Sequence, residues 1–139
     1  MVICFLSTFK LTFRVRETRK IIFHKHYFPD FYLKQTTAVR EKIEYVFTVI
    51  KHVTLVPTKF LKHIEGTDGL YEIRIEYQSN IFRVFCCFDS GNLFVLFNGI
   101  QKKSQKTPKK EIDLALKLKI EYFNNKNKHH DKERTNTKR

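Results

Sequence analysis

An α+β fold, with helices packed on a small antiparallel sheet, is predicted by three patterns in this sequence. Three strand-like runs, residues 70–77, 80–85 and 93–99, follow one another with short polar turns between them. Within residues 70–77 apolar and charged side chains alternate, as in a strand that buries one face. Apolar residues recur with a helical period in residues 31–52 and again after Pro108. The predicted order of elements is β-α-α-β-β-β-α.

The remaining elements are shorter. Residues 20–26 contain two isoleucines and a phenylalanine in succession and are predicted as the first strand. Residues 57–64 begin with proline and stop shortly before Gly66, a pattern that predicts a short second helix. The turns at residues 78–80 and 89–92 are too short for a crossover, so the three central strands are expected to be antiparallel.

Composition divides the chain into three segments. Residues 19–124 hold the periodic patterns and are predicted to form one domain, and 42% hydrophobic residues suffice for a core at this size. Residues 1–18 are an extension with three open interpretations: an added strand, a mobile arm, or translation from an overlong gene model. Residues 125–139 contain no aliphatic or aromatic residue and are predicted to be a disordered basic tail.

The net charge of the chain indicates which classes of molecule it binds. It has 27 Lys and Arg against 14 Asp and Glu, a formal net charge of +13. So large an excess on a small domain creates a strong positive field. Nucleic acid is the favoured partner, and a membrane surface or an acidic protein are the alternatives.

The positions of the cysteines and histidines, and the lengths of the apolar runs, argue against a disulfide-rich protein, a metalloprotein and a membrane-spanning protein. Cys4, Cys86 and Cys87 do not form a disulfide framework, which fits a reducing cytoplasm. Cys86 and Cys87 are neighbours on a strand, so they point to opposite faces and are expected to be buried rather than to share a metal. His24 and His26 lack further ligands nearby, so no metal site is expected. No cofactor motif is present, and no apolar run approaches the roughly 20 residues of a membrane span.

Basic residues on the strands indicate a phosphate-binding face. Arg74 and Arg83 lie on adjacent predicted strands, and an arginine on an apolar strand either covers a surface or holds an anion. Further lysines follow the third strand and are candidates for binding RNA backbone: Lys102, Lys103, Lys106 and Lys109. The structural alternatives are that the arginines form salt bridges with nearby carboxylates and that the lysines lie on a solvated basic loop.

Four segments, taken together in order and spacing, resemble the RelE/HigB superfamily of toxins from type II toxin–antitoxin systems, in its phage-derived HigB-like branch. They are residues 60–66, 70–74, 81–85, and 98–103 with 105–108. The resemblance implies a compact fold of the microbial-RNase type. It also implies a metal-independent endoribonuclease that cleaves mRNA at the ribosome, and an antitoxin partner, often with a helix-turn-helix domain.

The resemblance also implies roles for particular residues. Arg74 stands where relatives carry a basic strand residue, and Arg83 where they carry a phosphate-binding arginine. Lys102, Lys103 and Lys106 match the basic segment after the last strand, and Lys102 and Lys103 join the two arginines as candidate catalytic residues. Metal-free RNA cleavage needs a base for the 2′-hydroxyl, cations for the phosphorane and an acid for the leaving oxygen, and arginine forks suit phosphate oxygens.

The general acid and base are not fixed by the resemblance. Some relatives use a late tyrosine or histidine, but here no histidine lies between Lys102 and Glu111, and the first tyrosine after the strands is Tyr122. Glu72 and Glu76 share the predicted face of Arg74, so either is a candidate base, and Glu72 is the one we select. A mechanism dominated by arginine or lysine is the other option. The alternative functions are a non-catalytic nucleic-acid-binding protein and an inactive toxin relic that only binds an antitoxin.

Overall fold

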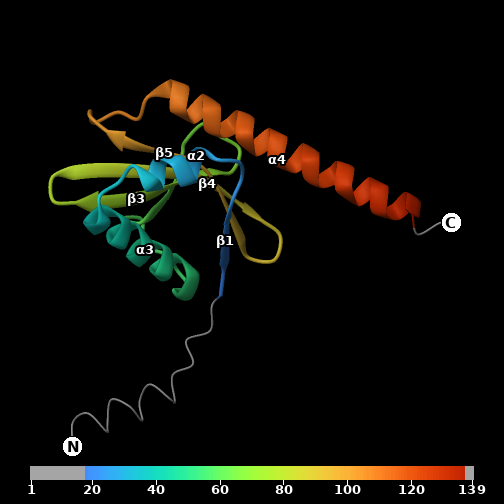
Figure 1. The fold of residues 1–139 in the computed structure, drawn as a ribbon, viewed down its shortest axis with the longest axis horizontal. Helices are drawn as coiled ribbons and strands as arrows, with labels where there is room; N and C mark the ends of the chain where they lie inside the picture. The colour runs from blue at the N-terminus through green and yellow to red at the C-terminus, as the bar shows by residue number, and fades with distance from the viewer. Residues whose placement is uncertain (1–17, 137–139) are drawn as a thin grey trace, which may run out of the picture.

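Five strands form one mixed sheet in the order β1-β5-β4-β3-β2 (Figure 1). The computed structural model describes residues 18–136. Its strands are β1 (Lys20–Phe23), β2 (Leu61–His63), β3 (Leu70–Tyr77), β4 (Asn80–Asp89) and β5 (Leu93–Lys102). Its helices are α2 (Tyr27–Leu33), α3 (Thr37–His52) and α4 (Lys109–Asn136).

The predicted α+β class and the antiparallel central strands are confirmed. β3 pairs with β4, and β4 with β5, through short hairpins. β1 is added on the far side of β5 and runs parallel to it, which makes the sheet mixed. β2 closes the opposite edge as a short antiparallel strand on β3.

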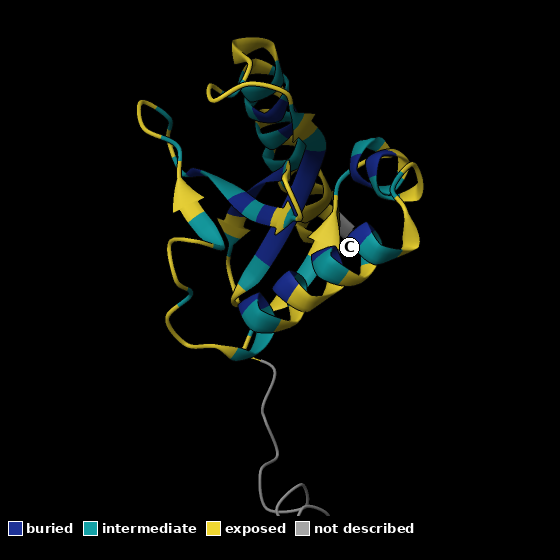
Figure 2. Ribbon diagram, turned by 90° about the vertical axis from the view of Figure 1, so that its left-hand side faces the viewer, coloured by how far each residue is buried: buried dark blue, intermediate teal, exposed yellow. Residues whose placement is uncertain are grey.

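Each face of the sheet carries its own core, and the buried residues lie between the sheet and the helices (Figure 2). On one face α2 and α3 pack on the sheet, with Ile43, Val46 and Ile50 fully buried. On the other face α4 packs through Ala115 and Leu118. Cys86 belongs to the first core and Cys87 to the second, so the expectation of two buried cysteines on opposite faces is confirmed.

A β-bulge in β5 changes which side chains face α4. Opposite Phe85 of β4, β5 has two residues, Phe97 and Asn98, where a regular ladder has one. Phe97 packs in the α4 core, and Asn98 Nδ2 donates to the main-chain oxygen of Glu111 at 3.1 Å. Because both residues turn toward α4, the alternation of β5 shifts by one position beyond the bulge.

The helix predicted for residues 31–52 is confirmed over α3, which ends at His52 as expected, but it is wrong for residues 31–36, where α2 ends and the chain breaks. α2 ends at Leu33 and α3 begins after Thr36, whose hydroxyl oxygen accepts a hydrogen bond from the Val39 N–H at 3.3 Å. This N-cap satisfies a free donor of the new helix. The guanidinium of Arg40 binds the main-chain oxygens at the end of α2, which stabilises the break.

The short helix predicted for residues 57–64 is also wrong. These residues form a turn followed by β2, and the chain then returns antiparallel as β3. The main-chain N–H of Arg74 donates to Phe60 O at 2.7 Å, and that of Ile64 to Leu70 O at 2.9 Å. Sheet pairing therefore overrides the local helix signal. β1 ends three residues earlier than predicted, and Lys25, with φ of 60°, turns the chain into α2.

α4 continues to Asn136, where the composition predicted a disordered tail from residue 125. Helix propagation costs little once a segment is nucleated, and the packed part of α4 supplies that nucleus. Residues 127–135 are exposed and extend away from the rest of the fold (Figure 1). The expectations for residues 1–17, including that for Cys4, lie outside the described residues.

Candidate functional site

Three neighbouring strands bring four of the predicted site residues together. Arg74 of β3 and Arg83 of β4 are direct cross-strand partners. Lys102 of β5 pairs with Ile81, two residues before Arg83 and on the same face of β4. Glu72 precedes Arg74 by two residues and therefore shares this face as well. We call these four side chains the cationic cluster.

Glu72 lies between the two arginines. Its Oε1 is 3.7 Å from Arg74 Nε, and its Oε2 is 3.7 Å from Arg83 Nε. Both Nε atoms are buried and lack a hydrogen-bond partner. At 3.7 Å the charges attract, but the distance is too long for a hydrogen bond. The carboxylate therefore holds the two guanidinium groups on one face without saturating their donors.

The two arginines differ in their access to solvent. The Arg74 side chain is 30% exposed, whereas that of Arg83 is 3% exposed. One Arg83 donor is used inside the sheet, where Nη1 donates to Phe82 O at 2.9 Å. Burial lowers the pKa of Arg83, and the Glu72 carboxylate opposes this shift. Arg74 can therefore contact an anion directly, while Arg83 supplies a positive field beneath it.

Lys102 completes the cationic cluster because of the bulge in β5. Without the extra residue, the alternation would place Lys103 on this face instead. Burial lowers the pKa of Lys102, and the neighbouring Arg83 and Arg74 charges lower it further against the opposing effect of Glu72. Its Nζ donates to Gln105 O at 2.6 Å, which fixes the ammonium group. A lysine with a lowered pKa gives up a proton more readily than an ordinary one.

The other predicted lysines lie outside the cationic cluster. Lys103 and Lys106 are exposed on the loop after β5, and Lys109 is exposed at the start of α4. Lys103 and Lys102 both line a cavity of about 280 Å³ that lies where β4 begins and β5 ends. These positions suit contacts with an extended polyanion more than contacts at one reacting atom.

Sequence reasoning missed Lys62 because it assigned residues 57–64 to a helix. In β2, Lys62 is the cross-strand partner of Glu72. Both residues line a cavity of about 280 Å³ that Thr107 and Ile112 close from the side of α4. The signal that could have revealed it is the alternation of Leu61, Lys62 and His63.

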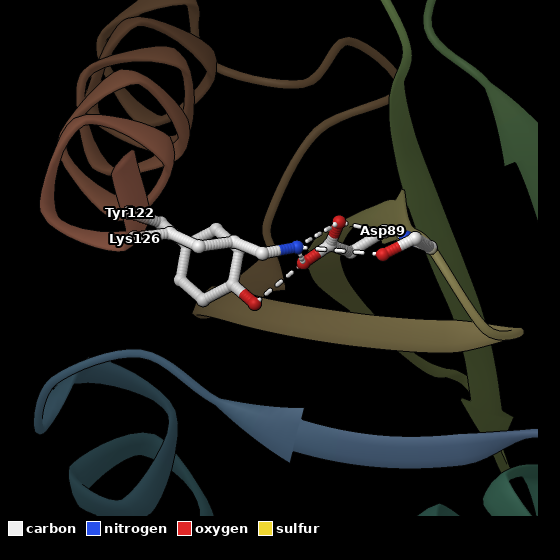
Figure 3. A network of polar contacts seen from close by, with 4 residues as sticks. Asp89, Tyr122 and Lys126 are labelled. Atoms are coloured by element: carbon white, nitrogen blue, oxygen red, sulfur yellow. Dashed lines mark hydrogen bonds and ion pairs between the residues drawn. The ribbon is translucent and has the colours of Figure 1, made fainter. Parts of the chain in front are cut away.

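Tyr122, the last tyrosine of the chain, lies in a different polar cluster (Figure 3). Its hydroxyl donates to Asp89 Oδ2 at 2.8 Å, and Lys126 Nζ is 2.8 Å from both oxygens of that carboxylate. Burial and the bond to Asp89 raise the pKa of Tyr122 to about 12. Asp89 is six residues from Arg83 along β4, a separation of about 20 Å in a strand. Tyr122 is therefore not placed to act at the cationic cluster.

Metal-binding clusters and membrane-spanning helices are both absent from residues 18–136. No group of three or more His, Cys, Asp or Glu side chains that could hold a metal ion is found among these residues. Within the same range, no helix combines the length and the apolar character needed to cross a membrane.

Comparison with known proteins gives a family match and a likeness to solved structures. The family described as "Phage derived protein Gp49-like" matches residues 30–119, more than half of the chain. A chain in the crystal structure of the archaeal RelE–RelB complex from Pyrococcus horikoshii OT3 is similar, with 14% sequence identity and a TM-score of 0.48. That match covers 64% of this chain and 99% of the other. No curated protein matches.

Proposed function

Because the chain belongs to the phage-derived Gp49-like family, a family of RelE-type toxins, we propose that it is the toxin of a type II toxin–antitoxin system and an endoribonuclease that cleaves mRNA at the ribosome. The observation that supports catalysis best is the cationic cluster. Three cations and one carboxylate converge there from three strands. This set can bind a phosphodiester and transfer protons without a metal ion.

In the proposed reaction the RNA supplies its own nucleophile. The 2′-hydroxyl oxygen attacks the adjacent phosphorus, and its proton passes to the Glu72 carboxylate. The bond from phosphorus to the 5′ oxygen breaks, and that oxygen takes a proton from the Lys102 ammonium. The products are a 2′,3′-cyclic phosphate and a 5′-hydroxyl end, so atoms and protons balance.

The arginines stabilise the negative charge that develops on the phosphorane. Arg74, the more exposed of the two, contacts the phosphate oxygens, because guanidinium groups bind such oxygens in pairs. Arg83 contributes its charge from below and keeps the pKa of Lys102 low. Lys103, Lys106 and Lys109 bind the flanking backbone of the RNA.

The proposed partners follow from family and charge. We propose a cognate antitoxin, with a helix-turn-helix domain, that neutralises the toxin in the cytoplasm. A formal charge of +13 favours both a polyanionic substrate and a partner that is acidic where it covers the cationic cluster.

A pair of adjacent lysines gives the sharpest test. Induced expression of the wild-type chain should arrest growth, and mRNA bound to ribosomes should be cleaved. Lys102→Gln should abolish both effects, whereas Lys103→Gln, which removes one proposed backbone contact outside the cationic cluster, should weaken cleavage only modestly. Circular dichroism and a melting curve establish that both variants fold.

The position of Tyr122 favours a second function. Some relatives use a late tyrosine as acid or base, but here Tyr122 is bound to Asp89, away from the cationic cluster. A chain without that group could bind RNA or an antitoxin without cleaving RNA. The expression experiment separates the two functions. If the wild-type chain binds RNA but neither arrests growth nor cuts ribosome-bound mRNA, catalysis is the wrong proposal and binding remains.

A further inference from the structure

A third cavity adjoins the cationic cluster, and two aromatic rings line it. It has a volume of about 360 Å³. Its lining residues come from α3, the turn before β2, and β3: Lys42, Tyr45, Lys59, Phe60, Arg74 and Glu76. No part of the proposed cleavage chemistry uses Tyr45, Phe60, Lys42 or Lys59.

Tyr45 presents an accessible ring on a rigid support. Tyr45 is 54% exposed although it lies on α3, whose opposite side is fully buried. Its ring meets that of Phe60 edge to face, with the centroids 6.3 Å apart and the planes at 74°. Phe60 is half-buried against the first core. Phe60 therefore fixes one edge of Tyr45 and leaves much of the ring open to solvent.

Cations surround these rings. Lys42 Nζ lies 5.0 Å from the centroid of the Tyr45 ring, and Lys59 Nζ lies 4.7 Å from that of Phe60. Such cation–π contacts keep ammonium groups beside the rings. Arg74 adds a third positive charge, and Glu76 is the one carboxylate in the lining. The cavity is thus both aromatic and net positive.

Arg74 connects this cavity to the cationic cluster. β2 begins at Leu61, so the edge of β3 beside Arg74 is flanked by the preceding turn. Arg74 Nη1 donates to Thr58 O at 3.5 Å, and its Nε is 3.7 Å from Glu72. One guanidinium group therefore borders the aromatic cavity on one side and the cluster on the other.

We propose that this cavity is a nucleobase-binding subsite for single-stranded RNA. The base stacks on the ring of Tyr45, and the adjoining phosphates lie on Lys42, Lys59 and Arg74. Aromatic rings interleaved with cations are the usual platform for unpaired bases. A cavity of about 360 Å³ is small among ligand pockets, which suits one base, and bases inside a duplex are not available for stacking.

The inference rests on the proposed function, since it extends the RNA path from the cationic cluster to α3. An acidic peptide from a protein partner is the competing occupant. It would use the lysines and Arg74 but would gain little from an exposed ring. The dependence of binding on the ring of Tyr45 and on the base of the RNA therefore distinguishes the two ligands.

Fluorescence anisotropy with a labelled single-stranded RNA oligonucleotide and the full chain provides the test. Tyr45→Ala should weaken binding about tenfold, because loss of one stacked base has an effect of this order. Tyr45→Phe keeps the ring and should bind within about twofold of wild type. Phe23→Ala is the matched control, because Phe23 on β1 is 57% exposed and lies outside this cavity.

An abasic oligonucleotide of the same length and charge completes the experiment. It should bind wild type about as weakly as RNA binds Tyr45→Ala, with no further loss in that variant. Equal affinity of wild type and Tyr45→Ala for RNA, with both folded, would overturn the subsite. Equal binding of RNA and abasic RNA by wild type would also overturn it and would favour the acidic peptide.

The cleavage assays test the proposed function independently of this subsite. Growth arrest by wild type and its loss in Lys102→Gln report on the proposed function and do not require Tyr45. If these effects occur while Tyr45→Ala binds RNA normally, only the subsite is wrong. If RNA binding depends on Tyr45 but no cleavage occurs, the subsite stands and the catalytic proposal fails.

Discussion

Gly99 is the position in β5 where the sheet has no room for a side chain. A Cβ atom there would lie 2.4 Å from Phe31 Cδ1 and 2.6 Å from Phe31 Cγ. Phe31 is buried in the first core, so its ring cannot withdraw without moving its neighbours. Gly99→Ala should therefore lower the free energy of unfolding by about 2 kcal/mol, as overpacking in a core does. Urea denaturation measures this change.

A double variant tests the cause of that loss. Phe31→Leu removes the atoms that would clash, at the cost of some core volume. If the clash is the cause, Gly99→Ala should be much less harmful in the Phe31→Leu background than in wild type. Equal losses in the two backgrounds would show instead that Gly99 acts through the backbone of the neighbouring bulge.

The same region shows how far single residues can be predicted. The juxtaposition of Arg74 and Arg83 follows from two strands, a short turn and a period of two, all of which are visible in the sequence. Which of the two lysines, Lys102 or Lys103, joins the cationic cluster cannot be predicted in this way, because it depends on one extra residue in β5. A bulge changes the parity of every later side chain, and the neighbouring Gly99 indicates an irregularity without fixing which residue is the extra one.

At the scale of elements, α4 is tied to the sheet by the carboxylate of Asp89. Burial raises the pKa of this group, but hydrogen bonds from Lys126, Tyr122 and the Ser90 N–H outweigh burial and lower it below the ordinary 3.8. Because the folded protein holds the deprotonated form more tightly, this contribution to stability is complete above the unfolded pKa. It is lost as the pH falls through the lower folded pKa.

Replacement of Asp89 by Asn should therefore flatten the acid side of the stability profile. The variant should lose about 2 kcal/mol at neutral pH, since hydrogen bonds to a charged group are broken. Wild type and Asp89→Asn should converge as the pH falls below about 4. Melting temperatures between acid and neutral pH measure both effects, with the exposed Asp113→Asn as control. Parallel curves for wild type and Asp89→Asn would exclude the carboxylate as the source of the pH dependence.

The elements that sequence predicted well are those with long, consistent patterns. β3 alternates over its whole length, and its boundaries, Leu70–Tyr77, match the prediction. β2 has three residues and is held by main-chain bonds to β3, so its identity depends on a distant segment of chain. The split between α2 and α3 depends on the cap at Thr36 and on the contacts of Arg40, which apolar periodicity alone does not reveal.

At the scale of the whole molecule, positive charge is spread well beyond the cationic cluster. The cluster, the loop with Lys103 and Lys106, and the aromatic cavity with Lys42 and Lys59 lie on or beside the same part of the sheet. The charge excess was visible in the composition, but its arrangement depends on the pairing of β3, β4 and β5. An extended single strand of RNA can contact all three regions, whereas a small anion would use only one.

Charge should control how the proposed antitoxin reaches the toxin. A partner that covers the cationic cluster must approach a body with a formal charge of +13, so long-range attraction should speed its encounter. Salt screens this attraction, and at physiological strength its range is about 8 Å. The association rate constant should therefore fall by about tenfold between low and physiological salt. Dissociation should change less, because apolar contacts sustain the affinity.

Stopped-flow association at several salt concentrations measures the rate, and acetylation followed by mass spectrometry maps the covered surface. In the complex Lys103 and Lys106 should react more slowly than in the free toxin. Lys20, exposed at the start of β1 and paired with Leu93 at the opposite end of β5 from Lys102, is the control and should react equally in both. Electrostatic encounter steers a partner toward the region where charge is densest. A rate constant that does not change with salt, together with full reactivity of Lys103 in a neutralised complex, would show that the antitoxin acts elsewhere on the fold.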